Sequence, residues 1–264
     1  METGKIRITV VTVCKNAEKQ IGATIQSVIS QTYDNVEYII IDGASTDHTA
    51  DIIEKATGEF PVVYQSEADK GIYDAMNKGI ALATGDYIHF LNAGDTFVDN
   101  TILQRVIEEI EKKPADIYYG NIIYQYPNGE SRIRTYGSSC GKRIYYCTGD
   151  CINHQAIFAS SKCLKGTPFD ASYKVCGDRD WMMRMHKMKA LFRNMPLVIC
   201  NYSLNENSVS LSNAQLSQRE ATRCIKEHFP MQYGIFCIFE ACRKNKALAR
   251  ILHGIYKLLY IRKR

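Results

Sequence analysis

Apolar stretches of two kinds alternate from Ile6 to Ile110, and this alternation constrains the fold more than any other feature. Short runs rich in β-branched and aromatic residues have the composition of buried strands: Ile6–Val13, Val36–Ile41, Val62–Tyr64 and Tyr87–Leu91. The segments that follow them have apolar residues at helical spacing: Ile21–Ile29, a short segment after Asp47, Ile72–Ala83 and Ile102–Ile110. Strands separated by helices predict an α/β fold, with a mostly parallel central sheet flanked by helices.

The chain after Asp116 has a looser pattern, which predicts a mixed second half. Two β-rich runs, 117–126 and 132–136, flank the turn sequence Pro-Asn-Gly and predict a hairpin. We expect further strands at Cys151–Ser160 and Leu197–Leu204, with a helix at Trp181–Met188 between them. We see no linker or repeat, so we expect one main domain over residues 1–212, followed by a basic helical segment over residues 213–264.

Composition excludes several classes of protein. The chain has 264 residues, of which 45% are hydrophobic, as in ordinary globular proteins. No apolar run reaches the roughly 18 residues that span a bilayer, and the start of the sequence lacks a signal-peptide core. The ten cysteines are scattered without a CxxC pair, so we expect reduced thiols rather than disulfides or a zinc site. These features predict a cytoplasmic protein.

The positive charge is concentrated at the C-terminus. Residues 243–264 contain eight Lys or Arg and no Asp or Glu, so the formal total of +5 leaves −3 for the rest of the chain. This distribution argues against nucleic-acid binding, which normally uses a basic folded face. Leu248, Ile251, Leu252, Ile255 and Leu259 would share one face of a helix. Two interpretations stay open: contact with an anionic membrane, or docking of a terminal helix on the domain.

Polar residues follow three of the predicted strands: Thr12–Asn16, Asp42–Asp47 and Asn92–Asp95. In open α/β sheets, ligands bind outside the carboxyl ends of the strands. We expect Ser45, Thr46 or Asp47 to cap the next helix, which leaves Asp42 in need of a ligand or a donor.

The sequence contains neither GxGxxG after its first strand nor GxxxxGK[ST], the loops that commonly bind nucleotide phosphates. A divalent cation held by a carboxylate is the usual alternative way to bind phosphates. Asp95 is the candidate ligand, and a turn or cap residue is the alternative role for it.

The chain contains four motifs in this order: VVTVCKN, IIIDGASTDHT, SEADKGIYDAMNKGIALATGDYIHFLNAGD and GDRDWMMRM. Together they resemble family 2 glycosyltransferases of the GT-A fold, the kind that builds bacterial cell-surface polysaccharides, over about residues 6–210. The resemblance implies a Rossmann-like sheet with a nucleotide-sugar half (1–100) and an acceptor half (101–212). It also implies transfer of a sugar, with inversion, from a donor such as a UDP-sugar to a hydroxyl of a glycan or lipid-linked acceptor. A divalent metal, Mn²⁺ or Mg²⁺, would assist.

The resemblance assigns roles to individual residues. It implies that Asp178 is the catalytic base and that Asp95 binds the metal. Two glycines depart from the family pattern, because many members carry an acid at the position of Gly94 and a glutamate at that of Gly177. The donor-binding residues implied are Thr12, Asn16, Asp42, Asp69, Lys70, Gly71, Asn92, Ala93 and Gly94, and the acceptor-side candidates are His154, Asp180 and Trp181.

Other interpretations remain at this point. For His154 we favour a core histidine bonded to the backbone over contact with the acceptor or a phosphate, and for Trp181 a helix anchor packed on the core over stacking on a sugar. A nucleotidyltransferase also uses a metal-bound nucleotide on an α/β sheet, although the missing phosphate loop argues against it. Gly94 suggests a second alternative, a sugar-nucleotide or glycan-binding module without catalysis, whereas retention of both Asp95 and Asp178 favours an enzyme.

Overall fold

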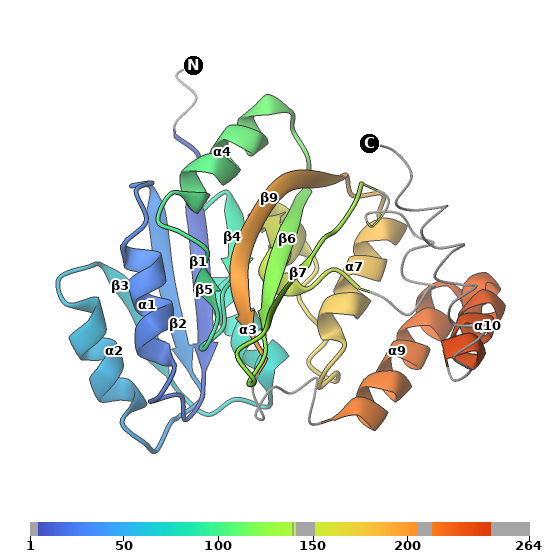
Figure 1. Ribbon diagram of the computed structural model, residues 1–264, viewed down its shortest axis with the longest axis horizontal. Helices are drawn as coiled ribbons and strands as arrows, with labels where there is room; N and C mark the ends of the chain where they lie inside the picture. Colours follow the sequence, from blue (N-terminus) through green and yellow to red (C-terminus); the bar gives the residue numbers. More distant parts are fainter. Residues whose placement is uncertain (1–4, 139, 141–150, 205–212, 244–264) are drawn as a thin grey trace.

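The first half of the chain alternates strands and helices (Figure 1). The computed structural model describes residues 5–138, 140, 151–204 and 213–243, without the side chains of residues 239, 240, 242 and 243. The order of elements confirms the α/β prediction. They are β1 (Ile8–Cys14), α1 (Ile21–Ile29), β2 (Val36–Asp42), α2 (Thr49–Thr57), β3 (Val62–Ser66), α3 (Ile72–Leu82), β4 (Tyr87–Phe90) and α4 (Ile102–Lys112).

The remaining elements confirm the predicted mixed second half, including the hairpin. They are β5 (Thr96–Phe97), β6 (Ile117–Gln125), β7 (Ser131–Arg134), the 3₁₀ turn η1 (His154–Ala156), β8 (Ile157–Ser160), α6 (Ser161–Gly166), α7 (Gly177–Lys187), β9 (Phe192–Ser203), α9 (Ala214–His228), η2 (Pro230–Gln232) and α10 (Tyr233–Arg243).

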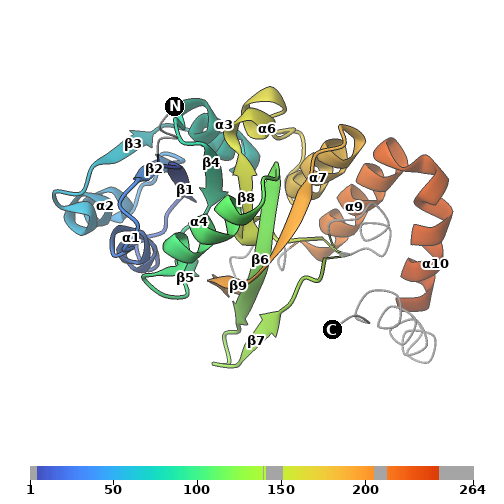
Figure 2. The same ribbon diagram turned by 90° about the horizontal axis from the view of Figure 1, so that it is seen from above.

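The described strands form one sheet in the order β3-β2-β1-β4-β8-β6-β9-β5, with β7 paired to β6 outside this path. Strands β3, β2, β1 and β4 are parallel, and β8 is antiparallel to both of its neighbours. Helices α1 and α2 lie on one face of the sheet and α3 on the other (Figure 2). All seven residues of β1 are buried because both faces are covered. Because β3, β2, β1 and β4 are parallel, their carboxyl ends lie at one edge of the sheet.

Strand β9 begins at Phe192, five residues before the predicted Leu197. Residues 192–194 pair in parallel with residues 117–119 of β6, and the register then shifts. Pro196 lies at this irregularity, where a bulge tolerates its missing N–H. The residues Phe-Arg-Asn-Met-Pro do not alternate in polarity, so their strand conformation depends on pairing with β6.

The strand predicted from Cys151 begins only at Ile157, because the preceding residues form η1. In a strand, neighbouring side chains would point to opposite faces of the sheet. Within the η1 turn, His154 contacts Asn92 and Gln155 contacts Asp95.

Helix α7 begins at Gly177, four residues before the predicted Trp181. The carboxylate of Glu220 in α9 accepts the backbone N–H groups of residues 174–176 at 2.8–2.9 Å, just before the helix. Asp178 therefore lies in the first turn of α7 and not before the helix, which corrects the prediction.

None of the helices in the described part of the chain is both long and apolar enough to cross a membrane. The segment 244–264, with its predicted membrane contact, lies outside the described residues. The division into residues 1–100, 101–212 and 213–264 stays a prediction.

Candidate active site

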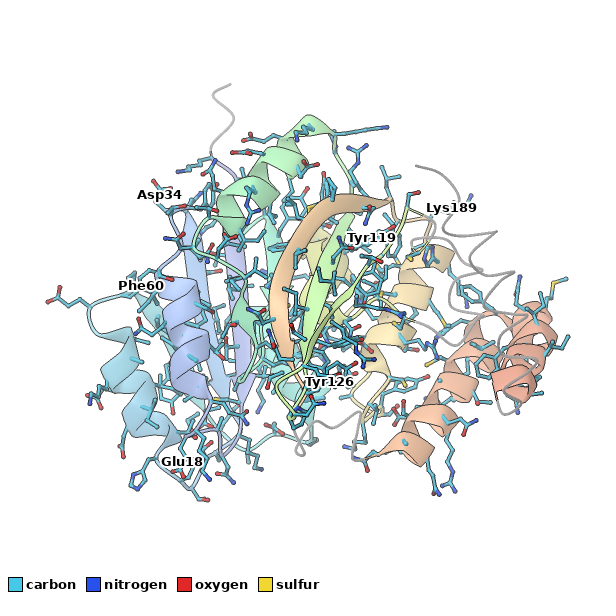
Figure 3. The ribbon with its side chains drawn as sticks, viewed as in Figure 1. Glu18, Asp34, Phe60, Tyr119, Tyr126 and Lys189 are labelled. Atoms are coloured by element: carbon cyan, nitrogen blue, oxygen red, sulfur yellow. The ribbon has the colours of Figure 1, made fainter. Side chains whose placement is uncertain are left out.

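The polar residues predicted to follow the strands do lie at one edge of the sheet. Figure 3 shows Glu18, which follows β1, and Tyr126, which follows β6, at this edge. Asp42 ends β2 and is 1% exposed. Its Oδ1 accepts the N–H of Ser45 at 3.2 Å, and its Oδ2 accepts the hydroxyl of Ser66 at 2.7 Å. Asp42 thus has donors within the protein and needs no ligand to be stable here.

The loops after β1 and β2 are joined by hydrogen bonds. Asn16 has a φ of 49°, and its Oδ1 accepts the N–H of Thr46 at 2.9 Å. Its own N–H donates to Ser45 Oγ at 2.7 Å. Asp47 accepts the N–H of Thr49, the first residue of α2, at 3.1 Å. The N-cap of α2 is His48, without a side-chain cap, so the predicted capping by Ser45, Thr46 or Asp47 is wrong. Asn16 and Thr46 remain exposed, so this part of the edge is open to a ligand.

The segment after β3 folds over the end of β2. Asp69 lies so close to Gly43 that a Cβ on the glycine would stand 2.3 Å from Asp69 Oδ2. Asp69 Oδ1 accepts the N–H of Gly71 at 2.9 Å. Lys174 reaches this segment from the second half of the chain, and its Nζ donates to the carbonyl of Lys70 at 2.6 Å. The sequence held no signal for Lys174, because its contact joins residues 104 positions apart.

Thr12 faces the core. It is fully buried, and its hydroxyl donates to the carbonyl of Leu91 at 2.8 Å. The side chain of Thr12 therefore joins β1 to the end of β4, and the predicted part of this residue in donor binding stays a prediction.

Asp95 is buried directly after β4, with 3% exposure. Its Oδ2 accepts the Nε2–H of Gln155 at 3.0 Å, and its Oδ1 accepts the N–H of Ser203 at 3.0 Å. Burial raises the pKa of Asp95 to about 7, although both hydrogen bonds oppose this shift. Gln155 was missed as a site residue, because its contact with Asp95 spans 60 positions.

Gly94 has a backbone reason for departing from the family pattern. Its φ is 100°, a conformation that residues with a Cβ rarely adopt, and a Cβ would lie 2.9 Å from Gln20 Oε1. Its N–H donates to the hydroxyl of Thr24 at 3.0 Å. An acidic side chain does not fit here, so Asp95 is the acid that this loop provides. Ala93 is part of the same loop and is half-buried.

His154 connects the end of β4 to Asp178. The Nδ1 atom of His154 lies 3.5 Å from Asp178 Oδ2, and its Nε2 lies 3.0 Å from Asn92 Nδ2. If Asn92 Nδ2 is the donor of this contact, Nε2 accepts and the proton of the neutral ring is on Nδ1, facing the carboxylate. His154 and Asp178 also border a cavity lined by apolar side chains, including Phe169. His154 thus contacts two side chains that the sequence predicts for the site, Asn92 and Asp178.

The amide oxygens near Asp95 are suited to a cation. Asn92 Oδ1 and Gln155 Oε1 are buried and have no hydrogen-bond partner among the described residues. Carboxylate and amide oxygens are ligands for Mg²⁺ and related ions. The amide oxygens of Asn92 and Gln155 thus lack a donor among the described residues, while both oxygens of Asp95 accept hydrogen bonds, from Gln155 and Ser203.

Tyr73 explains the second departure, at Gly177. A Cβ on Gly177 would lie 2.7 Å from the Tyr73 ring. The Tyr73 hydroxyl donates to the carbonyl of Val175 at 2.7 Å and lies 3.4 Å from Asp178 Oδ1. The ring occupies the space that the family's glutamate would need, and its hydroxyl contacts Asp178.

Asp180 points away from Asp178, whereas Trp181 lines the same cavity as His154 and Asp178. Asp180 pairs with Arg184 at 2.8 Å and with His228 at 2.6 Å. It lies two residues after Asp178 in α7, and side chains two residues apart on a helix point in nearly opposite directions. Trp181 is 2% exposed and donates its Nε1–H to the carbonyl of Thr167, as a core anchor does.

Asp180, Glu227 and His228 lie close enough together to hold a metal ion. The guanidinium of Arg184, however, already pairs with one oxygen of Asp180, which disfavours a cation at this cluster.

Comparisons with known proteins give one consistent family. The sequence model of glycosyl transferase family 2 matches residues 9–191. A PGL/p-HBAD biosynthesis glycosyltransferase of Mycobacterium bovis is 34% identical over 195 residues, which cover 71% of this chain and 73% of the relative. Glycosyltransferase GlyG of Streptococcus pneumoniae is 30% identical over 155 residues, which cover 57% of this chain and 47% of the relative.

Solved structures share the fold at low sequence identity. Residues 1–349 of S. aureus TarS, in complex with UDP-GlcNAc, align with a TM-score of 0.67 at 17% identity over 89% of this chain and 71% of that one. The mannosyltransferase PcManGT of Pyrobaculum calidifontis, in complex with GDP-Man and Mn²⁺, aligns with a TM-score of 0.63 at 16% identity over 98% and 82% of the two chains.

Proposed function

The chain belongs to glycosyl transferase family 2 and is a transferase enzyme, and from this premise we propose that it transfers a sugar, with inversion, from a UDP-sugar to a hydroxyl group. The observation that carries the proposal is the contact chain Asn92–His154–Asp178. It connects the end of the nucleotide-side strand β4 to a carboxylate on a helix of the second half. A donor at the edge of the sheet and an acceptor at α7 would then meet at Asp178.

The exposed edge after β1, β2 and β3 would hold the nucleotide. Asp42 and Asn16 fix the loops there, and Thr46 remains accessible. Lys70 and Lys174 are both exposed and meet beside Gly71. Their ammonium groups would balance the negative charge of a diphosphate. The donors GDP-Man and UDP-GlcNAc in the two solved neighbours support a nucleotide-sugar ligand.

Asp95 would hold a divalent metal, Mn²⁺ or Mg²⁺, with the amide oxygens of Asn92 and Gln155. Such an ion stabilises the negative charge that develops on a leaving diphosphate. The Mn²⁺ bound to the solved mannosyltransferase supports this assignment. In this chain, the loop after β4 has glycine at position 94 instead of a second acid. Asp95 would therefore be the single carboxylate ligand that this loop gives the metal.

Asp178 would act as the general base. Its carboxylate takes the proton of the acceptor hydroxyl while that oxygen bonds to the anomeric carbon, and the bond from this carbon to the diphosphate oxygen breaks. The electron pair of the broken bond leaves with UDP. Attack on the face opposite the leaving group inverts the anomeric centre. His154 would orient Asp178 through its Nδ1–H, and the Tyr73 hydroxyl lies on the other carboxylate oxygen.

The acceptor class and location are also proposals. The mycobacterial relative is named for the biosynthesis of PGL and p-HBAD, and this supports a glycan or lipid-linked acceptor in a cell-surface pathway. We place the enzyme in the cytoplasm, where ten scattered cysteines stay reduced.

Thermal unfolding with a panel of nucleotide sugars, with Mn²⁺ or with EDTA, tests the donor site, because a bound donor raises the melting temperature by mass action. We expect a UDP-sugar with Mn²⁺ to give the largest shift, and the same donor to release UDP slowly by hydrolysis. No shift with any nucleotide sugar, together with no release of UDP, would contradict the proposal.

A further inference from the structure

Helix α10 and the turn before it expose an apolar face. Met231 is 92% exposed, Ile235 38% and Ile238 61%. Phe236, by contrast, is 3% exposed and belongs to the core cluster. Every exposed side-chain position described from 231 to 241 is apolar or glycine: Met231, Gly234, Ile235, Cys237, Ile238 and Ala241.

The spacing of this face is helical. Positions 231, 234, 235, 238 and 241 recur at intervals of three and four, so they share one side of the helix. A helix on the surface of a globular protein normally directs such a stripe at the core. Here the stripe, hereafter the α10 face (residues 231, 234, 235, 238 and 241), faces away from the domain. The helix lies at the end of the molecule remote from β3 in both views (Figures 1 and 2).

One described cation lies beside α10, and the sequence that follows the helix is basic. Lys226 of α9 is exposed, and its Nζ lies 4.8 Å from the ring centre of Tyr233, at the start of α10. From Pro230 to the end of the chain the sequence contains one acid, Glu240, and eight Lys or Arg. The rest of the chain is mildly acidic, so the basic residues are concentrated in the sequence that continues from α10.

We propose that the α10 face is a docking surface for an anionic lipid bilayer. Apolar side chains flanked by Lys and Arg suit the boundary between acyl chains and acidic headgroups. A second copy of this chain fits less well, because two such ends would bring like charges together and the face is small beside a typical dimer interface of about 800 Å² per partner. A nucleic acid would offer the isoleucine side chains little apolar surface to pack against. The proposal does not depend on the sugar-transfer reaction.

Vesicle flotation of the full chain tests the docking surface. The vesicles contain phosphatidylcholine alone or with phosphatidylglycerol, at low and at high salt. We expect flotation with the anionic vesicles at low salt, and much less with neutral vesicles or at high salt. In the variant Ile235→Ser with Ile238→Ser, the partition coefficient should fall about tenfold or more, because two buried side chains are lost from the bilayer.

The matched control is Ile133→Ser with Leu191→Ser, since these residues are 61% and 55% exposed and lie outside α10. This control should float like the parent protein. Melting curves of both variants check that the fold is intact. Flotation that is equal in the parent and the α10 variant, or absent from the parent, overturns the proposal. If the parent is a dimer in solution and the α10 variant is a monomer, while both float equally, the α10 face binds a second copy of the chain instead.

Discussion

The Nδ1 atom of His154 lies 3.5 Å from Oδ2 of Asp178, and the two residues come from different elements, η1 and α7. The opposite ring nitrogen contacts Asn92 at the end of β4. The imidazole thus holds the first turn of α7 at a fixed place relative to the edge of the sheet. In the proposed reaction, this contact determines where the base meets an acceptor hydroxyl.

Asp178→Asn should leave donor binding nearly intact and lower turnover by at least about a hundredfold, because the amide cannot take a proton. Calorimetry with UDP and a steady-state assay measure the two quantities. The control Asp170→Asn changes a carboxylate on the exposed side of Arg223 and should keep normal turnover. Near-normal turnover of the Asp178 variant would remove this residue from the mechanism.

His154→Ala should lower kcat about tenfold while the KM for the donor stays nearly constant. The reason is that the contact of Nδ1 with the carboxylate of the proposed base is lost while the nucleotide edge remains unchanged. His48→Ala is the matched control, because His48 is exposed and pairs only with the surface residue Asp51. A parallel loss of melting temperature and donor affinity in the His154 variant would assign a purely structural role to the histidine.

The sequence predicts the parallel half of the sheet well. Strands that helices cover on both faces are continuous apolar runs, which are easy to recognise. It also locates Asp178 and His154. It could not predict the contact of Gln155 with Asp95 or that of Lys174 with Lys70, since both join residues that are distant in sequence. These contacts depend on how the two halves of the chain pack.

The glycine departures show a different limit. From the sequence, Gly94 and Gly177 are departures from the family pattern, and Gly94 suggests a binding module without catalysis. The structure gives steric reasons instead: a positive φ at Gly94 and the Tyr73 ring against Gly177. A local sequence pattern around Gly177 does not show that the ring of Tyr73, which is distant in sequence, fills the space beside it.

Gly177→Ala should destabilise the protein by about 1–3 kcal/mol, because the new methyl group meets the Tyr73 ring at 2.7 Å. Thermal melting measures this loss. Gly166→Ala is the control, since no atom lies within 4 Å of a Cβ there. In a Tyr73→Leu background the cost of Gly177→Ala should shrink, and an unchanged cost would show that the ring is not its cause.

Asp95→Ala should abolish the part of UDP binding that depends on Mn²⁺, because the single carboxylate of this loop is removed. Calorimetry of UDP with Mn²⁺ and with EDTA measures that part, which should fall at least about tenfold. Asp51→Ala, at an exposed carboxylate, should leave it unchanged. Retention of the full Mn²⁺ effect in the Asp95 variant would place the metal elsewhere.

His89 should make the protein acid-sensitive. It is fully buried, stacks on Phe158 at 4.3 Å and contacts the carbonyl of Ile157 through Nδ1. Burial lowers its pKa to about 4 from a usual 6.5. A folded-state pKa below the unfolded value gives stability that is present above pH 6.5 and is lost as the pH falls toward 4.

At pH 5 this loss amounts to about 2 kcal/mol relative to pH 8, or roughly 4–8 °C in melting temperature. His89→Gln cannot take up a proton, so its melting temperature should fall less between pH 8 and pH 5 than that of the parent, whatever its stability at neutral pH. In the His48→Ala variant the melting temperature should not fall less than in the parent, because the contact with Asp51 raises the pKa of His48, opposite to the shift at His89. Identical pH profiles for the parent and His89→Gln would mean that His89 titrates normally in the folded protein and that other groups cause the acid sensitivity.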